Sequence, residues 1–166
     1  MRLLICDDAP QFKLITEDLS LCWVHDGRHY KKLTPFILYH RKLIDTFLTQ
    51  YWDFYDLLLE YKKDPTLKDK MILEKKFDEL FSTVTGYDAL DERISKTKEK
   101  KSALLIALDH PEIPLHNNSS ELGARTRVRK RDVSFGPRTA DGVQAWDTFM
   151  TLAATAKKLR LFFNSC

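Results

Sequence analysis

Apolar residues recur at steps of three and four residues over a long stretch that begins after Pro35 and ends near Lys63. This spacing places one apolar face on a helix of 3.6 residues per turn. Asp64-Pro65 ends the pattern, because proline disfavours helix in the residue before it. The recurring positions are Ile37, Ile44, Phe47, Leu48, Tyr51, Trp52, Tyr55, Leu58 and Leu59. A long amphipathic helix must therefore find a core to pack against.

Two further helices follow the same periodicity. The second starts at Thr66 and stops at Gly86, and the third runs from about Asp88 to Leu108. The charged middle of the third, SKTKEKK, is expected to be a solvated face rather than a site. Residues 35–110 are therefore predicted to form an all-helical hairpin or small bundle.

The first 24 residues have a different pattern. A continuous apolar run from Leu3 to Cys6 stops at Asp7-Asp8, a short helix is expected from Pro10, and a second run extends from Leu19 to Val24. Continuous apolar strands joined through a helix are typical of a parallel sheet covered by helices. Two short strands do not make a stable sheet alone, so a partial sheet is expected. The predicted fold class is an α/β remnant dominated by helices, with two short parallel strands.

Composition excludes several classes of protein. With 166 residues, of which 43% are apolar, the chain has enough material for one core. No apolar run approaches the roughly 18 residues that would cross a bilayer, so no membrane partner and a cytoplasmic location are expected. Three cysteines without a repeated C-x-x-C indicate neither a disulfide framework nor a structural zinc site.

Positive charge gathers in the C-terminal third. After an extended linker, HPEIP, the helix starters Asn117 and Asn118 begin a helix that is expected to run to about Arg131, and a final helix is expected over residues 143–159. Between Glu121 and Arg138 there are six basic residues and two acids. Arg125, Arg127, Arg129, Lys130 and Arg131 are the candidates for DNA-backbone contacts, which would weaken steeply with salt. The alternative is a solvated helix face.

Three carboxylates are candidates for metal binding. Asp7 and Asp8 follow the first strand, where open α/β sheets place their sites, and only one of two neighbours points into a given site. Asp7 is favoured as the first residue past the apolar run, although both acids also suit a helix cap. Glu121 falls at the third position of the helix that Asn118 begins, as a capping-box carboxylate does. Two such acids brought together on Mg²⁺ would suit attack on a phosphodiester.

Cys22 and His25 stand three residues apart at the end of the second apolar run. A zinc site would need two more ligands, and no matching pair lies nearby. If the segment is a strand, an odd spacing also turns the two side chains to opposite faces, which argues against a Cys-His catalytic pair. The favoured interpretation is a buried cysteine with a histidine at the strand terminus.

Taken in order, these motifs resemble a known family. An Asp at a strand end, C-x-x-H after the next strand, a long helical insertion and P-L-x-N-N-x-x-E at the start of a basic helix are similar to the second half of the DDE transposases of bacterial insertion sequences. That family has an RNase H-like catalytic core. The resemblance covers nearly the whole chain, from LLICDDAPQF through LCWVHDGRHY and HPEIPLHNNSSELGARTRVRKRDVSFGPRT to TLAATAKKL.

The resemblance implies specific roles. Asp7 and Glu121 would be the second and third acids of a triad that holds Mg²⁺ for DNA strand cleavage and transfer, with Cys22 and His25 near the site. Residues 1–34 would be a partial core, 35–110 the insertion, and 111–166 the rest of the core. The family's first acid lies on an upstream strand that this chain does not contain, so a truncated, inactive fragment is expected. The alternatives are a non-catalytic DNA-binding remnant or a helical oligomerisation module.

Overall fold

The computed structural model describes residues 3–8, 16, 18–118 and 139–159, together with residues 122, 125, 128–130, 132, 133, 136 and 137. It divides into two compact units, residues 1–117 and residues 118–166. The helix predicted from Pro10 falls on residues outside the described set. Each unit is described below by itself.

The first unit begins with a two-stranded parallel sheet, as the apolar runs predict. Strand β1, Leu3–Cys6, pairs with β2, Asp18–Leu21, in a register that sets Cys6 opposite Leu21. Because the strands are parallel, the residues that follow them, Asp7 and Cys22, emerge at the same edge. The predicted class, a helix-dominated α/β fold with two short parallel strands, is confirmed at this level.

The second strand is shorter than predicted. The apolar run continues to Val24, but the chain turns at Cys22 into helix α1, Trp23–Lys31. Trp23, Asp26, Gly27 and Tyr30 are its buried residues. This is the i, i+3, i+4, i+7 spacing of a helix face. An apolar dipeptide at a strand end is ambiguous, and burial of this face decides in favour of helix.

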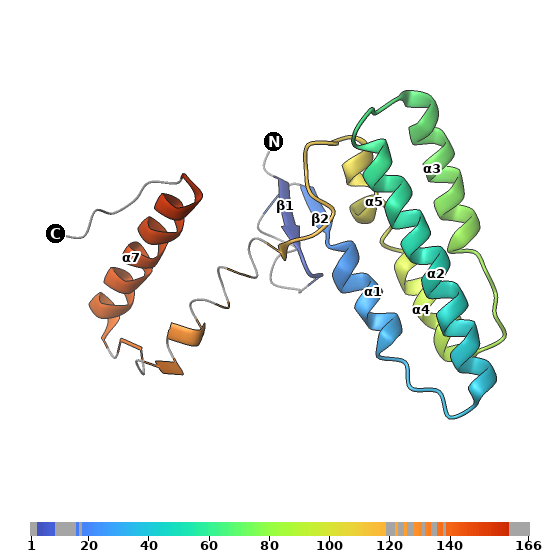
Figure 1. Ribbon diagram of the computed structural model, residues 1–166, viewed down its shortest axis with the longest axis horizontal. Coiled ribbons are helices and arrows are strands. Elements are labelled where there is room, and N and C mark those ends of the chain that lie inside the picture. The colour runs from blue at the N-terminus through green and yellow to red at the C-terminus, as the bar shows by residue number, and fades with distance from the viewer. Residues whose placement is uncertain are drawn as a thin grey trace. The chain divides into compact units, whose positions relative to one another are not determined.

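Three longer helices cover α1, and Figure 1 shows α2 and α3 running side by side and antiparallel. They are α2 (Leu38–Tyr61), α3 (Leu67–Leu80) and α4 (Asp88–Lys98). The bounds of α2 confirm the helix expected between Pro35 and Lys63. Thr66 caps α3 through its side chain, which accepts a hydrogen bond from the Asp69 amide at 3.0 Å.

One glycine fixes how closely α1 approaches α2. A Cβ at Gly27 would lie 2.8 Å from Cζ2 of Trp52 and 3.1 Å from Cε1 of Tyr51. These distances are too short for real side chains, so only glycine allows this approach.

The single third helix expected over residues 88–108 is interrupted. Helix α4 ends at Lys98, and a turn leads to the short helix α5, Lys101–Leu104, and the 3-10 helix η2, Ile106–Leu108. Leu104, Leu105, Ala107 and Leu108 are all buried. A straight helix on a surface buries one stripe only, so burying both sides of this segment requires the chain to turn.

The core of the first unit is aromatic and continuous from the sheet to the end of the helical segment. Trp23 lies at its centre, fully buried, with its ring centroid 5.4 Å from that of Tyr51 and 5.5 Å from that of Phe54. Its Nε1 donates to the Leu104 carbonyl at 2.9 Å. The sheet and the predicted helical insertion therefore share one core.

The second unit contains α7, Ala140–Lys158, close to the predicted final helix, with Thr139 as its N-cap. The sequence pattern turns Trp146, Phe149, Met150, Leu152, Ala153 and Ala156 towards a core. In the structure Ala156 is buried, whereas Phe149 is 70% and Leu152 54% exposed. The apolar stripe of α7 is thus mostly uncovered.

Asp91 anchors the start of α4. Its carboxylate accepts hydrogen bonds from the Thr85 amide at 2.8 Å, the Thr85 hydroxyl at 2.6 Å and the Gly86 amide at 3.0 Å. Burial favours the neutral form of Asp91, but these hydrogen bonds outweigh it and lower the pKa of the carboxyl below its usual range. Gly86 takes a left-handed φ of 80° in this turn.

Replacing Asp91 with alanine should lower the free energy of unfolding at pH 7 by about 1 to 2 kcal/mol, as loss of a helix cap does. Because the folded pKa is depressed, the stabilisation is complete above the unfolded value near 4 and fades as pH falls through the folded pKa. Urea unfolding at several pH values measures this. Asp88→Ala, in the same first turn, should cost no more than about 0.5 kcal/mol; a pH-independent loss in Asp91→Ala would contradict the prediction.

Candidate site at the carboxyl edge of the sheet

Two backbone hydrogen bonds bring three distant motifs to the carboxyl edge of the sheet. The Cys22 amide donates to the Cys6 carbonyl at 2.9 Å, which holds the end of β2 beside the end of β1. The Trp23 amide donates to the Leu115 carbonyl at 3.0 Å. Figure 1 shows the segment after η2 returning to this edge. The strand-end acids, C-x-x-H and the start of P-L-x-N-N thus converge within the first unit.

The return of this segment is fixed along its length by contacts with α2 and α3. The Tyr61 hydroxyl donates to the Leu108 carbonyl at 2.8 Å, and the Lys62 ammonium donates to the Ile113 carbonyl. Lys70 forms an ion pair with Asp109. Leu115 is itself buried in the core, 3% exposed. The predicted linker is therefore a docked segment that carries its motif to the sheet.

The two strand-end acids lie in different environments. Asp7 is exposed and forms no ion pair with any residue that the structure describes. Asp8 is partly buried, and its Oδ2 lies 2.5 Å from the Lys100 ammonium. Asp8 also takes a left-handed φ of 58°. The carboxylate of Asp7 is thus the one exposed to solvent at this edge, and that of Asp8 is held by a cation.

Cys22 and His25 do not lie on a strand, which corrects the expectation that their side chains point to opposite faces. Cys22 is the N-cap of α1 and His25 lies in its first turn, so their spacing of three places them on one side of the helix. Cys22 is buried, and Nε2 of His25 lies 3.0 Å from Nη1 of Arg28.

Burial acts on the thiol at the end of β1. Burial first, and then the negative charges of Asp7 and Asp8, raise the pKa of the Cys6 thiol to about 11. The thiol is therefore protonated at neutral pH and is a poor nucleophile. Cys6 is a packing residue rather than a reactive one.

Two polar atoms near the returning segment are buried without a hydrogen-bond partner among the described residues. They are Nδ1 of His116 and Oδ1 of Asn117. Buried polar groups are normally satisfied, so such atoms beside a candidate site are consistent with a missing ligand or water.

Part of the predicted site lies outside the described residues, namely Glu121, Arg127 and Arg131. In the second unit, Arg125, Arg129 and Lys130 are described, helical and exposed. Among the residues that the structure describes, no group of three or more His, Cys, Asp or Glu side chains could hold a metal ion. The described part of the site thus supplies Asp7 as a single exposed carboxylate ligand, which by itself does not make a Mg²⁺ site.

A buried charge cluster lies next to this edge, and sequence reasoning missed it. Its centre is Asp26, 5% exposed, which forms an ion pair with Arg93 of α4 and accepts a hydrogen bond from the Thr97 hydroxyl at 2.8 Å. Because Thr97 uses its proton on Asp26, the Tyr30 hydroxyl, 2.6 Å away, donates to Thr97. The Lys100 ammonium lies 4.0 Å from Asp26 as well as beside Asp8.

This cluster corrects the interpretation of SKTKEKK as a solvated face. Thr97 is fully buried, and the Lys100 side chain is 23% exposed. Burial, and the nearby charge of Asp26, raise the pKa of Tyr51, whose hydroxyl donates to the Trp23 carbonyl at 2.9 Å and also reaches Asp26. The available sequence signal was one acid, Asp26, at a buried position of a helix face.

A second basic surface belongs to the first unit. Between Gly27 and Ile44 the sequence has five Lys or Arg residues and no acid. Lys32, Arg41 and Lys42 are exposed there, beside Phe36 and Tyr39, which are 106% and 64% exposed. Sequence analysis placed the basic surface only in the C-terminal third, because it counted net charge rather than the absence of acids.

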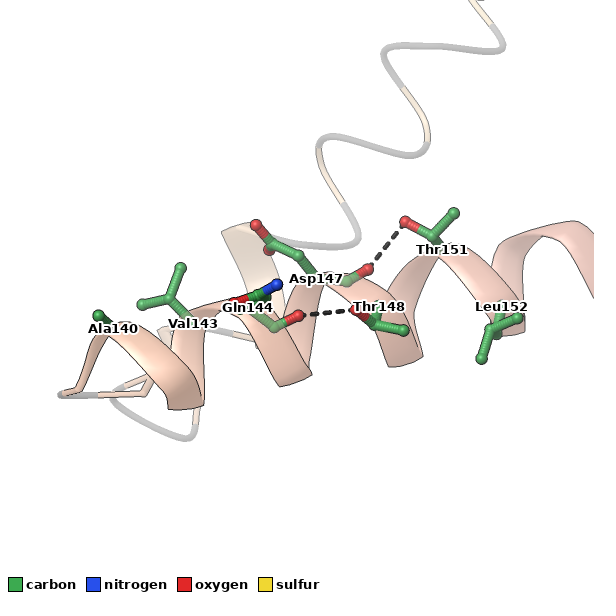
Figure 2. A pocket seen from close by; sticks show the side chains of 7 residues that line it. All are labelled: Ala140, Val143, Gln144, Asp147, Thr148, Thr151 and Leu152. Carbon is green, nitrogen blue, oxygen red and sulfur yellow. Dashed lines mark hydrogen bonds between the residues drawn. The ribbon is translucent and has the colours of Figure 1, made fainter.

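The hollow along α7 offers no comparable chemistry. Its lining, from Ala140 to Leu152, comes from this one helix. Figure 2 shows that the Thr148 and Thr151 hydroxyls point back to the carbonyls of Gln144 and Asp147, to which they donate at 2.9 and 2.8 Å. These polar groups are thus occupied within the helix. No described helix is long and apolar enough to cross a membrane.

Comparison with known proteins gives one informative relative. The chain is 36% identical over 160 residues to a protein of Sinorhizobium fredii (strain NBRC 101917 / NGR234) named "Uncharacterized protein y4jO". The alignment covers 96% of this chain and 49% of that protein, so the chain spans about half the length of its relative. No family model matches the chain, and no solved structure matches it. Nearly the whole chain, both units included, thus has a counterpart within a longer protein.

Proposed function

We propose that this chain is the C-terminal part of a DNA transposase with an RNase H-like core, in which Asp7 and Glu121 bind Mg²⁺ for DNA strand cleavage and transfer. The observation that carries the proposal is the convergence at the carboxyl edge of the sheet. The Cys22–Cys6 and Trp23–Leu115 hydrogen bonds join the strand-end acids to C-x-x-H and to the segment that leads into Glu121.

The position of Asp7 suits this role. It follows a parallel strand directly and is exposed, and open α/β sheets bind their ligands at this edge. The chain from Leu115, whose carbonyl bonds Trp23, to Glu121 is six residues long, an extended reach of about 20 Å at most. Glu121 can therefore meet Asp7 without any rearrangement of the first unit. Mg²⁺ held by both carboxylates would polarise a phosphodiester and its attacking oxygen.

The basic surfaces support DNA as the partner. Arg125, Arg129 and Lys130 are exposed on the second unit, and Lys32, Arg41 and Lys42 on the first. Phosphate contacts by such side chains supply most non-specific affinity for DNA. Exposed Phe36 and Tyr39 add apolar and aromatic surface beside the second group. Two separate basic surfaces suit a substrate longer than one contact patch.

Cleavage and strand transfer are proposed for the longer protein of which this chain would be a part. The relative of Sinorhizobium fredii is about twice as long as the aligned region. One described carboxylate and Glu121 would hold a metal ion less firmly than a triad. The chain alone is accordingly expected to bind Mg²⁺ and DNA and not to cleave DNA.

The test is a Mg²⁺ titration of the labelled chain, followed by NMR at the side-chain carboxyl carbons. Asp7 and Glu121 should shift together along one binding curve, because both ligate the same ion. Asp7→Asn and Glu121→Gln should each remove the response of the other residue. Short duplex DNA should tighten binding, since phosphate oxygens add ligands of the kind that Mg²⁺ prefers.

Asp18→Asn is the matched control, because Asp18 begins β2 at the opposite edge of the sheet and its replacement should leave the titration unchanged. Arg129→Glu with Lys130→Glu should weaken DNA binding and its salt dependence without changing Mg²⁺ binding in the absence of DNA. Independent curves for Asp7 and Glu121, or a crystal structure with their carboxylates more than roughly 8 Å apart in the presence of Mn²⁺, would refute the shared metal site.

A further inference from the structure

Four charged side chains form a row from the strand-end turn into the core of the first unit. The order is Asp8, Lys100, Asp26 and Arg93, so negative and positive groups alternate and the row is neutral. Asp8 follows β1, Asp26 lies on α1, Arg93 on α4, and Lys100 in the turn between α4 and α5. This charged row connects the strand-end acids to the helical segment.

The inner end of the row is rigid. The Asp26 side chain is 4% and the Arg93 side chain 12% exposed. Asp26 is held by Arg93, by the Thr97 hydroxyl at 2.8 Å and, more weakly, by the Tyr51 hydroxyl at 3.4 Å. Every one of these partners comes from a helix with a buried face. The inner end is therefore a fixed reference point for the groups outside it.

The outer end of the row is under conformational strain. Asp8 has a φ of 58°, a left-handed backbone that costs an ordinary residue roughly 1 kcal/mol or more. Its carboxylate lies 2.5 Å from the Lys100 ammonium. A contact of this kind, anchored on its other side, offsets the strain and keeps the residue in one conformation.

The strained residue also decides where its neighbour points. The backbone of Asp8 sets the direction in which the chain leaves β1, and Asp7 is the residue between them. Asp7 is exposed while Asp8 is turned to Lys100. If Asp8 relaxed to an extended conformation, continuing the strand, the two carboxylates would exchange faces.

We infer that Lys100 is a positioning residue for the acid site: held beside buried Asp26, it fixes the left-handed turn at Asp8 and so aims Asp7 at the metal. This inference rests on the proposed function for the role of Asp7, while the control of the turn stands on the contacts alone. The helical segment thereby gains a function beyond spacing, because the break between α4 and α5 is what brings Lys100 to the sheet.

The sign of the effect separates positioning from direct electrostatics. A cation near a metal site repels the metal, so if Lys100 acted by its charge alone, its removal would tighten Mg²⁺ binding. If Lys100 positions Asp7 through Asp8, its removal weakens Mg²⁺ binding. Residues that orient metal ligands typically change metal affinity by about 10- to 100-fold.

The experiment compares Lys100→Met, Lys100→Arg and Lys101→Met in the labelled full chain. NMR reports two quantities: the backbone carbon shifts and amide exchange of Asp8, and the Mg²⁺ affinity read at Asp7. Lys100→Met should abolish the left-handed shift pattern of Asp8 and lower the affinity about tenfold or more. Lys100→Arg, which keeps a cation, should restore both. Lys101 pairs with Asp78 on α3, so Lys101→Met should change neither.

A double variant removes the ambiguity of a general loss of structure. Glycine adopts positive φ without strain, so Asp8→Gly in the Lys100→Met background should recover most of the Mg²⁺ affinity at Asp7. An unchanged Asp8 backbone in Lys100→Met, or tighter Mg²⁺ binding, would overturn the inference. If the unaltered chain shows no Mg²⁺ response at Asp7, the proposed function fails, and the Asp8 backbone still decides whether Lys100 controls the turn.

Discussion

Replacing Arg93 with methionine is expected to lower the free energy of unfolding by about 3 to 5 kcal/mol, the usual cost of removing one partner of a buried ion pair. Arg93 and Asp26 are almost fully buried, and they lie 67 residues apart in the sequence. Methionine fills similar volume without the charge, so the loss comes mainly from an Asp26 carboxylate left with Thr97, Tyr51 and a more distant Lys100. Urea unfolding followed by circular dichroism measures it.

The pair Lys96–Glu92 on the same helix is the matched control. Both side chains are more than half exposed, although their charged atoms lie 2.5 Å apart. Lys96→Met should therefore cost less than about 1 kcal/mol. Adding Asp26→Leu to Arg93→Met should recover much of the loss, because the uncompensated charge is then gone. Equal costs for the two single variants would show that burial does not strengthen the Asp26–Arg93 pair.

Replacing Trp23 with alanine is expected to cost about 3 to 5 kcal/mol, as large-to-small changes in a well-packed core do. Trp23 is fully buried among aromatic rings from two helices, with Phe54 on α2 and Phe77 on α3 at centroid distances of 5.5 and 6.2 Å. The variant also leaves the Leu104 carbonyl without its donor. Circular dichroism, rather than tryptophan fluorescence, should follow the unfolding, since the change removes a fluorophore.

Two further variants divide this loss into its parts. Trp23→Phe keeps most of the apolar volume but removes Nε1, so it should cost about 1 to 3 kcal/mol for the unsatisfied carbonyl and the smaller ring. Trp52→Ala, at a half-buried position on α2, should cost less than Trp23→Ala. If Trp52→Ala proved the more damaging change, the core would be centred on α2 rather than on the start of α1.

Trp23 also connects stability to the candidate site. Its amide donates to Leu115 and its side chain to Leu104, so one residue holds both ends of the segment that returns to the sheet. A loss of packing at Trp23 should therefore release the P-L-x-N-N motif from the strand-end acids. The sequence motif C-x-x-H contains this tryptophan, which gives the motif a structural role whatever the chemistry of Cys22 and His25.

Several features of the fold followed from the sequence because they depend on local pattern. The three-to-four spacing from Ile37 to Leu59 predicted α2, and Thr66 predicted the start of α3. The continuous run Leu3–Cys6 predicted a parallel strand ending at an acid. Periodicity and capping act within a few residues, so a single sequence carries their signal in full.

Other features were decided by contacts between distant residues. Val24 continued an apolar run, yet helix α1 begins at Trp23, because Trp23 and Tyr30 bury one helix face in the shared core. The segment 95–101 contained no glycine or proline, yet it breaks, because the leucines from 104 onwards are buried on both sides. Neither outcome is encoded in the residues that change conformation.

The candidate site divides in the same way. The sequence determined which residues carry chemistry at the strand end, namely the acids Asp7 and Asp8, because an apolar run that stops at a carboxylate is a local event. Only the tertiary structure decided that Lys100 holds Asp8 and that Asp26 lies behind it, 4.0 Å from the same ammonium. A lysine in a charged stretch looks solvated until a distant buried acid gives it a partner, and electrostatic pairing across 92 residues leaves no periodic trace in the sequence.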